Sequence, residues 1–253
     1  MLKEKIKETY GNIAQTGNSG CCTSDGCCAV PDFSVKQTSF KIGYDNKTLE
    51  SIPESSILGL GCGVPVDFAN LKEGERVVDL GSGAGIDVFL ASKKVQNNGK
   101  IIGIDFTDKM IAKARNAAQE NGFSNVEFRK GDIEDKIPVK DSTVDAAISN
   151  CVINLATDKV KAFKEIYRIL KKGGLGRMVI SDLVTNEEVR SDSVNAEKWC
   201  GCIDGALTRE NYIQSIKDAG FQNVEILDEK QYLDEHIPAG REITSLTIKA
   251  ITG

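Results

Sequence analysis

The feature that most constrains this chain is a glycine-rich turn between a short apolar run and an amphipathic segment. The stretch VVDLGSGAGIDVFLAS occupies residues 77–92. Residues 75–80, just before the glycines, have the apolar character of a buried strand, and residues 86–95 suit a helix. A strand, a glycine turn and a helix in this order are typical of a nucleotide-binding unit in a parallel sheet. The remainder of the chain is therefore expected to continue an α/β fold.

The rest of the sequence repeats this alternation of strand and helix. Further strands are predicted at 100–105, 125–130, 144–149, 177–182, 223–228 and 243–250. Helical patterns occupy 109–121, 158–172, 187–199 and 209–219. Strands that alternate with helices indicate a mostly parallel, Rossmann-like sheet of seven strands with helices on both faces.

The first part of the chain is less regular. Residues 1–70 are predicted to be an N-terminal cysteine-rich arm with helices, including one at 45–57 that Pro53 disturbs. Residues 71–253 are predicted to be the cofactor-binding domain, with substrate-binding elements around 185–215.

Three glycines follow the first predicted strand with the spacing G-x-G-x-G, at Gly81, Gly83 and Gly85. A dinucleotide fingerprint needs G-x-G-x-x-G, so this turn does not match a pyrophosphate-binding loop. Asp105 ends the second predicted strand, where a carboxylate can accept hydrogen bonds from both hydroxyls of a ribose. The pattern therefore indicates a nucleoside cofactor without a diphosphate.

Carboxylates gather around this turn, at Asp79, Asp87, Asp105 and Asp132. An acidic pocket suits the sulfonium and amino-acid tail of S-adenosylmethionine better than the diphosphate of NAD. Alternatively, the glycines only turn the chain and the aspartates are solvated. The register of strand, loop, helix and second-strand acid favours S-adenosylmethionine.

Charge and composition limit the expected partners. The formal net charge is −5, so the chain gains no general attraction to nucleic acid or anionic lipid, and neither is an expected partner. The N-terminus lacks a signal-peptide core and no stretch is long enough to span a bilayer, which predicts a cytoplasmic protein with reduced thiols. Eight cysteines in that setting suggest metal, metalloid or redox chemistry, whereas the single histidine, His236, is assigned no role.

Several cysteines stand where strands of this fold end. Cys62 lies in LGLGCGVP, Cys151 in SNCVINL after the fourth predicted strand, and Cys200 and Cys202 in EKWCGCIDGAL. Free cysteines are often packing residues. Because these converge on the carboxyl ends of strands, a site for a soft ligand is the better interpretation.

The sequence resembles arsenite methyltransferases, a family of class I S-adenosylmethionine-dependent methyltransferases. The resemblance rests on LGLGCGVP, VVDLGSGAGIDVFLAS, GIDFTDKM, SNCVINL and C-I-x-G-A-L. It implies a last strand antiparallel to the others, and a cofactor pocket with three parts. The methionine end would contact Asp79, Gly81, Ser82, Gly83 and Gly85, the ribose Asp105 and Phe106, and the adenine Asp132 and Ile133, while Met110 and Asn150 line the same pocket.

The resemblance also implies an arsenic site. Cys62, Cys151 and Cys202 would be the thiols that bind arsenite or methylated trivalent arsenicals, and Cys200 is an additional, accessory cysteine. Thioredoxin or a small thiol would then serve as the reductant. The stretch GCCTSDGCC, residues 20–28, contributes Cys21 or Cys22 as accessory thiols able to pair with Cys62, whereas its last two cysteines go beyond the family pattern.

Two other functions stay open at this point. One is methylation of a small organic acceptor such as a quinone precursor, with structural cysteines. The other is a cysteine-rich protein that sequesters metalloids on a degenerate methyltransferase scaffold, against which the intact glycine turn and acids argue.

Overall fold

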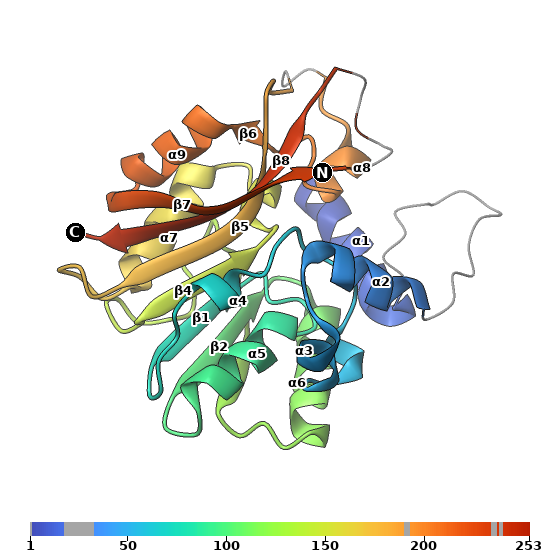
Figure 1. The fold of residues 1–253 in the computed structure, drawn as a ribbon, viewed down its shortest axis with the longest axis vertical. Helices are drawn as coiled ribbons and strands as arrows, with labels where there is room; N and C mark the ends of the chain where they lie inside the picture. The colour runs from blue at the N-terminus through green and yellow to red at the C-terminus, as the bar shows by residue number, and fades with distance from the viewer. Residues whose placement is uncertain (1, 18–32, 190–192, 234–236, 238–239) are drawn as a thin grey trace.

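The computed structural model of the protein describes residues 2–17, 33–189, 193–233, 237 and 240–253. These residues form one eight-stranded sheet covered by helices on both faces (Figure 1). The strands run in the spatial order β3-β2-β1-β4-β5-β8-β7, with β6 paired only to β5. Their bounds are β1 (Arg76–Leu80), β2 (Lys100–Asp105), β3 (Val126–Lys130), β4 (Ala146–Asn150), β5 (Arg177–Thr185), β6 (Leu207–Thr208), β7 (Phe221–Tyr232) and β8 (Ile243–Thr252).

The direction of the strands confirms the predicted fold class. Strands β1 to β5 pair in parallel, and β8 lies antiparallel between β5 and β7. The sheet has eight strands rather than seven because the two-residue β6 pairs in parallel with the end of β5, where Val184 faces Leu207. The seven longer strands keep the predicted arrangement.

Helices and short 3-10 turns connect the strands. Their bounds are α1 (Leu2–Thr16), α2 (Phe33–Ile42), α3 (Asn46–Glu50), η1 (Glu54–Ser56), α4 (Pro65–Phe68), α5 (Ile86–Val95), α6 (Asp108–Glu120), η2 (Ile153–Leu155), α7 (Lys159–Ile169), α8 (Ala196–Cys200) and α9 (Arg209–Asp218). Successive residues of a strand face opposite sides of the sheet. Val77 accordingly packs with α5 and α6, and Val78 with α7 and α9, so both faces are buried.

Two helix predictions are wrong. Of the helix predicted at 187–199, only α8 is present among the residues that the structure describes there. The side chain of Asn195 caps the backbone N–H groups of Glu197 and Lys198, and Glu188 accepts hydrogen bonds from Thr208. Such polar side chains compete with a continuous helix. The helix predicted at 45–57 ends at Glu50, and only η1 follows Pro53.

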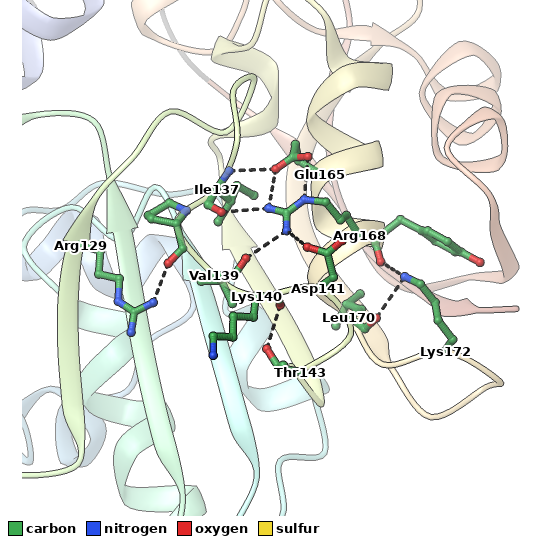
Figure 2. A network of polar contacts seen from close by, with 12 residues as sticks. Arg129, Ile137, Val139, Lys140, Asp141, Thr143, Glu165, Arg168, Leu170 and Lys172 are labelled. Carbon is green, nitrogen blue, oxygen red and sulfur yellow. Dashed lines mark hydrogen bonds and ion pairs between the residues drawn. The ribbon is translucent and has the colours of Figure 1, made fainter.

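Arg168 of α7 fixes the loop that leads into β4 (Figure 2). Its guanidinium donates to the carboxylates of Glu165 and Asp141 and to the carbonyls of Ile137 and Val139, at 2.5–3.0 Å. Charge-assisted bonds of this kind are among the stronger polar contacts in proteins. The network therefore holds the start of β4, whose other end carries the predicted site residues.

Helix α1 covers the carboxyl edge of the sheet and contacts both α6 and α8. Lys3 forms ion pairs with Asp132 and Glu134 at 2.7 and 2.8 Å, and the Tyr10 hydroxyl donates to the carbonyl of Cys200 at 2.9 Å. The N-terminal segment thus touches both ends of the candidate site. The proposed division of the chain near residue 70 stays a prediction.

Candidate active site

A cavity of about 770 Å³ lies along the carboxyl ends of β1, β2 and β4, under helix α1. Most of the residues predicted for the cofactor line it, and so do three of the predicted thiol residues. These are Asp79, Gly81, Ser82, Gly83, Asp105, Phe106, Met110, Asp132, Ile133, Asn150, Cys151, Cys200 and Cys202. The position agrees with the rule that ligands of open α/β sheets bind beyond the carboxyl ends of the strands.

The glycine turn shapes one wall of this cavity. Gly81 has a φ of +66°, and a Cβ there would lie 2.4 Å from the side chain of Val152. The backbone N–H of Gly83 donates to the Asp105 carboxylate at 3.0 Å, which holds that side chain at the end of β2. Gly85 caps the start of α5 and packs under Phe128, so it supports the turn instead of lining the cavity.

A cluster of buried carboxylates faces the same wall. Asp79, Asp87 and Asp105 are each at most 8% exposed, and no ion pair among the described residues involves them. Burial, followed by the charges of Asp87 and Asp105, raises the pKa of Asp79 well above its usual range. Burial also raises the pKa of Asp87 to about 6. A cation bound beside these carboxyls would offset the burial and the mutual repulsion that raise their pKa values and so favour their ionised forms, which suits the cavity to a cationic ligand.

Asn150 joins the carboxylate cluster to the loop that carries Cys62. Its side-chain oxygen accepts from the N–H groups of Cys62 and Gly63 at 3.0 and 3.3 Å. Its amide nitrogen donates to the Gly63 carbonyl, to the Tyr44 hydroxyl and to Asp87, at 2.7, 3.0 and 3.2 Å. The side chain predicted to contact the cofactor is therefore mainly occupied in holding the Cys62 loop.

Tyr44 is a residue that sequence reasoning missed. It is 2% exposed, and its hydroxyl donates to Asp87 at 3.0 Å while accepting from Asn150. Its position in the irregular segment between α2 and α3 gave no motif to identify it, because its partners lie 43 and 106 residues away in sequence.

Three of the predicted thiols meet at the end of β4. Cys62, Cys151 and Cys202 pack in one cluster, and the Cys202 thiol donates to the Cys151 carbonyl at 2.9 Å. Hydrogen bonds with the thiols of Cys202 and Cys62, and then burial, raise the pKa of Cys151 well above its usual range. The three thiols are free of disulfides, and Cys151 and Cys202 line the cavity while Cys62 lies buried beside them, so together they offer ligands to a soft atom.

The backbone at two of these thiols is unusual for its residue type. Cys151 and Cys202 have φ angles of +58° and +64°, in the left-handed region that non-glycine residues rarely adopt. Such conformations cost about 1–3 kcal/mol and concentrate at functional sites. The strain at both residues supports a functional rather than a packing role for them.

The remaining predicted thiols behave differently. The Cys200 side chain forms a hydrogen bond with Thr9 of α1 and does not join the cluster of the other three. Cys21, Cys22, Cys27 and Cys28 lie outside the described residues, as does His236.

Asp182 is the second residue that sequence reasoning missed. It lies on β5, is 1% exposed, and has a carboxylate oxygen within 4.8 Å of the sulfurs of Cys62 and Cys151. Burial raises the pKa of Asp182 to about 6. An acid in the middle of the mainly apolar strand sequence RMVISDLVT was the signal that could have identified it.

Within the described ranges, no helix combines the length and the apolar character needed to cross a membrane.

Comparisons with known proteins agree with this geometry. The family model described as a methyltransferase domain matches residues 71–228. The chain belongs to this methyltransferase family, and its sheet is that of the class I methyltransferases.

The names of individual similar proteins describe a narrower activity than the family model does. An arsenite methyltransferase of Halobacterium salinarum is 38% identical over 98% of this chain and 66% of its own length. An arsenite methyltransferase of Aquipseudomonas alcaligenes is 32% identical over 90% of this chain and 64% of its own length. The chain is also similar to the crystal structure of an arsenic (III) S-adenosylmethionine methyltransferase from Chlamydomonas reinhardtii, with 29% identity and a TM-score of 0.67 over 84% of this chain and 72% of that one. The chain thus spans just under two thirds of the length of these curated relatives.

Proposed function

We propose that the protein transfers methyl groups from S-adenosylmethionine to trivalent arsenic bound by Cys62, Cys151 and Cys202. The observation that carries the proposal is the cluster of these three thiols beside the cofactor cavity. The names of the similar arsenite methyltransferases support it. Membership of the methyltransferase family does not specify which atom receives the methyl group. A buried cluster of thiols favours a soft acceptor atom such as trivalent arsenic.

The residues around the cavity fit the cofactor. The carboxyls of Asp79 and Asp87, which form no ion pair among the described residues, suit the cationic methionine end of the cofactor. The Asp105 carboxylate suits the ribose hydroxyls. The Ser82 hydroxyl is buried with no hydrogen-bond partner among the described residues, as expected of a group that awaits a ligand. Asp132 and Ile133 line the end assigned to adenine, where Asp132 also pairs with Lys3.

The thiols supply the binding chemistry for arsenic. When bound, the cofactor supplies a methyl group activated by a sulfonium. The three thiols displace the hydroxyls of arsenous acid, and each thiol proton leaves with a hydroxyl as water. The arsenic then keeps a lone pair that is free to attack that methyl carbon. Positioning by the three cysteines then contributes much of the rate, and no general base is required.

Turnover needs electrons, because methylation converts arsenic from the trivalent to the pentavalent state. We infer that two thiols return two electrons by forming a disulfide, which thioredoxin or a small thiol then reduces. Cys21 or Cys22 are the proposed accessory thiols for this step. Reduced thiols at the site also fit a cytoplasmic location, which belongs to the same proposal.

Product identification tests the proposed function. The full chain is incubated with arsenite, labelled S-adenosylmethionine and a thiol reductant, and the arsenic species are separated by chromatography. We expect labelled methylated arsenic. Labelled product from a quinone precursor, with none from arsenite, would show that the acceptor is a small organic molecule.

Cofactor affinity should depend on pH through Asp87. Its carboxyl contacts Tyr44 and Asn150 and lies near Asp79 and Asp67, and its pKa of about 6 means that it ionises only above that pH. We therefore expect the affinity for S-adenosylmethionine, measured by calorimetry, to fall as the pH drops through about 6. The Asp87→Asn variant, which has no carboxyl to titrate, serves as the control and should show a flatter profile.

The stability of the free protein should change in the opposite sense. A carboxyl whose pKa is raised in the folded state keeps its proton while the unfolded chain, with the ordinary value of 3.8, has already lost its own. The contribution of Asp87 to the free energy of unfolding therefore falls as the pH rises from about 4 to about 6. A contribution that rises over this interval, measured as wild type minus Asp87→Asn, would contradict the buried position of Asp87.

A further inference from the structure

The carboxylate of Asp182 is fixed beside the thiol cluster by groups from three elements. The Tyr212 hydroxyl of α9 donates to it at 3.0 Å, the backbone N–H of Asn154 in η2 at 3.0 Å, and the backbone N–H of Leu183 in β5 at 3.1 Å. Three donors on one carboxylate favour its ionised form and restrict its movement. The site thus holds a pre-oriented anion next to Cys62 and Cys151.

The proposed reaction moves positive charge toward this anion. Arsenic bound to three thiolates is neutral, and its lone pair forms the new arsenic–carbon bond. The carbon–sulfur bond of the methyl donor breaks, and its electron pair stays on sulfur, which becomes neutral. The positive charge of the donor therefore ends on the methylated arsenic, and no other reactant is needed for the balance.

We propose that Asp182 stabilises the positive charge that develops on arsenic during methyl transfer. The proposal rests on the proposed function and adds a residue to it. Among the described residues, Asp182 is the carboxylate that has an oxygen within 4.8 Å of the sulfurs of Cys62 and Cys151. A fixed charge aimed at the place where charge develops, in a site shielded from water, is an effective way to lower a barrier.

A second buried charge opposes Asp182 and offers an independent test. Lys159 is 7% exposed, donates to the carbonyls of Asn154 and Ala156, and stacks over Trp199 at 5.4 Å. Its positive charge interacts with both Asp182 and Cys202. Because the Lys159 charge also lowers the pKa of Asp182, the test is made well above pH 6, where Asp182 stays ionised without it. Under that condition the removal of a positive charge near the same centre should not impair a step that builds positive charge.

The first experiment compares Asp182→Asn with Tyr212→Phe. Asn keeps the shape of the side chain and removes its charge, whereas Phe keeps the Asp182 charge and removes one hydrogen bond. We expect Asp182→Asn to lower the single-turnover rate of arsenic methylation at least about tenfold. Tyr212→Phe should lower it less than about threefold. Equal losses in the two variants would overturn the proposal, because they would show that the hydrogen-bonded structure matters and the charge does not.

Arsenite binding without cofactor gives a second readout. Trp199 is the single tryptophan and lies in α8 beside Cys202, so its fluorescence can report arsenite binding in wild type and variants. We expect the arsenite Kd of Asp182→Asn to stay within about threefold of wild type, because the thiols remain. A loss of binding that accounts for the whole loss of rate would overturn the proposal by making Asp182 part of the binding site alone.

Lys159→Met keeps the proposal testable if Asp182→Asn does not fold. With arsenite binding retained, we expect the methyl-transfer rate of Lys159→Met to equal or exceed that of wild type. A loss of more than about tenfold would overturn the proposal. Methylated arsenic from the wild-type protein in the same assay establishes the underlying function, so failure of the charge proposal is distinguishable from failure of the function.

Discussion

Replacing Cys151 with Ser should reduce the formation of methylated arsenic at least about 100-fold, because a hydroxyl is a hard ligand that binds trivalent arsenic far less tightly than a thiolate. Cys151 is central to the cluster, since its thiol forms hydrogen bonds with both Cys62 and Cys202. The loss should appear mainly as weaker arsenite binding, measured by Trp199 fluorescence, together with lost turnover. Ser and Cys are close in shape, so the left-handed backbone at this position is retained.

Two measurements show whether the loss is specific. The affinity of Cys151→Ser for S-adenosylmethionine should stay within about threefold of wild type, since the carboxylates and the glycine turn are unchanged. Cys200→Ser should lose less activity than Cys151→Ser, because the Cys200 thiol contacts Thr9 rather than the cluster. Full arsenic methylation by Cys151→Ser would contradict the proposed site and favour a small organic acceptor with structural cysteines.

Much of the fold could be predicted because its signals are local. The apolar run before Gly81, the glycine spacing and the acid that ends β2 are each visible within a few residues, and together they define a βα unit of a parallel sheet. The meeting of Cys62, Cys151 and Cys202 follows from the same logic, because parallel strands place their carboxyl ends at one edge. A cysteine that follows or flanks the carboxyl end of one strand is therefore expected to lie near cysteines in the same position on neighbouring strands.

The parts that could not be predicted depend on contacts between distant segments. Tyr44 reaches Asp87 and Asn150 only after the N-terminal segment packs on the sheet, and no spacing in the sequence records that contact. The helix predicted at 187–199 failed for a related reason, since Glu188 is held by Thr208 twenty residues away. Side-chain bonds across the fold outweigh a weak helical propensity.

Asn150 shows how a structure changes the interpretation of a residue that the sequence had found. The family resemblance assigns it to the cofactor, yet its oxygen holds two N–H groups of the Cys62 loop and its nitrogen holds the Gly63 carbonyl. The Ser245 hydroxyl secures the same loop by donating to the Cys62 carbonyl at 2.6 Å. Asn150 is thus the side chain that connects Asp87, which lines the cavity, with Cys62, one of the thiols proposed to bind arsenic.

Asn150→Leu should therefore impair the arsenic site as well as the fold. Leucine has a similar size but leaves the Cys62 and Gly63 N–H groups and the Gly63 carbonyl without this partner, which should lower the free energy of unfolding by roughly 3 kcal/mol. Because the Cys62 loop is then no longer held against β4, we expect the arsenite Kd to rise at least about tenfold. Denaturant unfolding and Trp199 fluorescence measure the two effects.

Tyr44→Phe separates the role of Asn150 from that of the wider network. This variant removes the hydroxyl between Asp87 and Asn150 but leaves the bonds from Asn150 to the Cys62 loop. Its arsenite Kd should stay within about threefold of wild type, while its cofactor affinity changes because the Asp87 carboxylate loses a donor. An equal loss of arsenite affinity in both variants would show that the network as a whole, and not the Asn150 amide, positions Cys62.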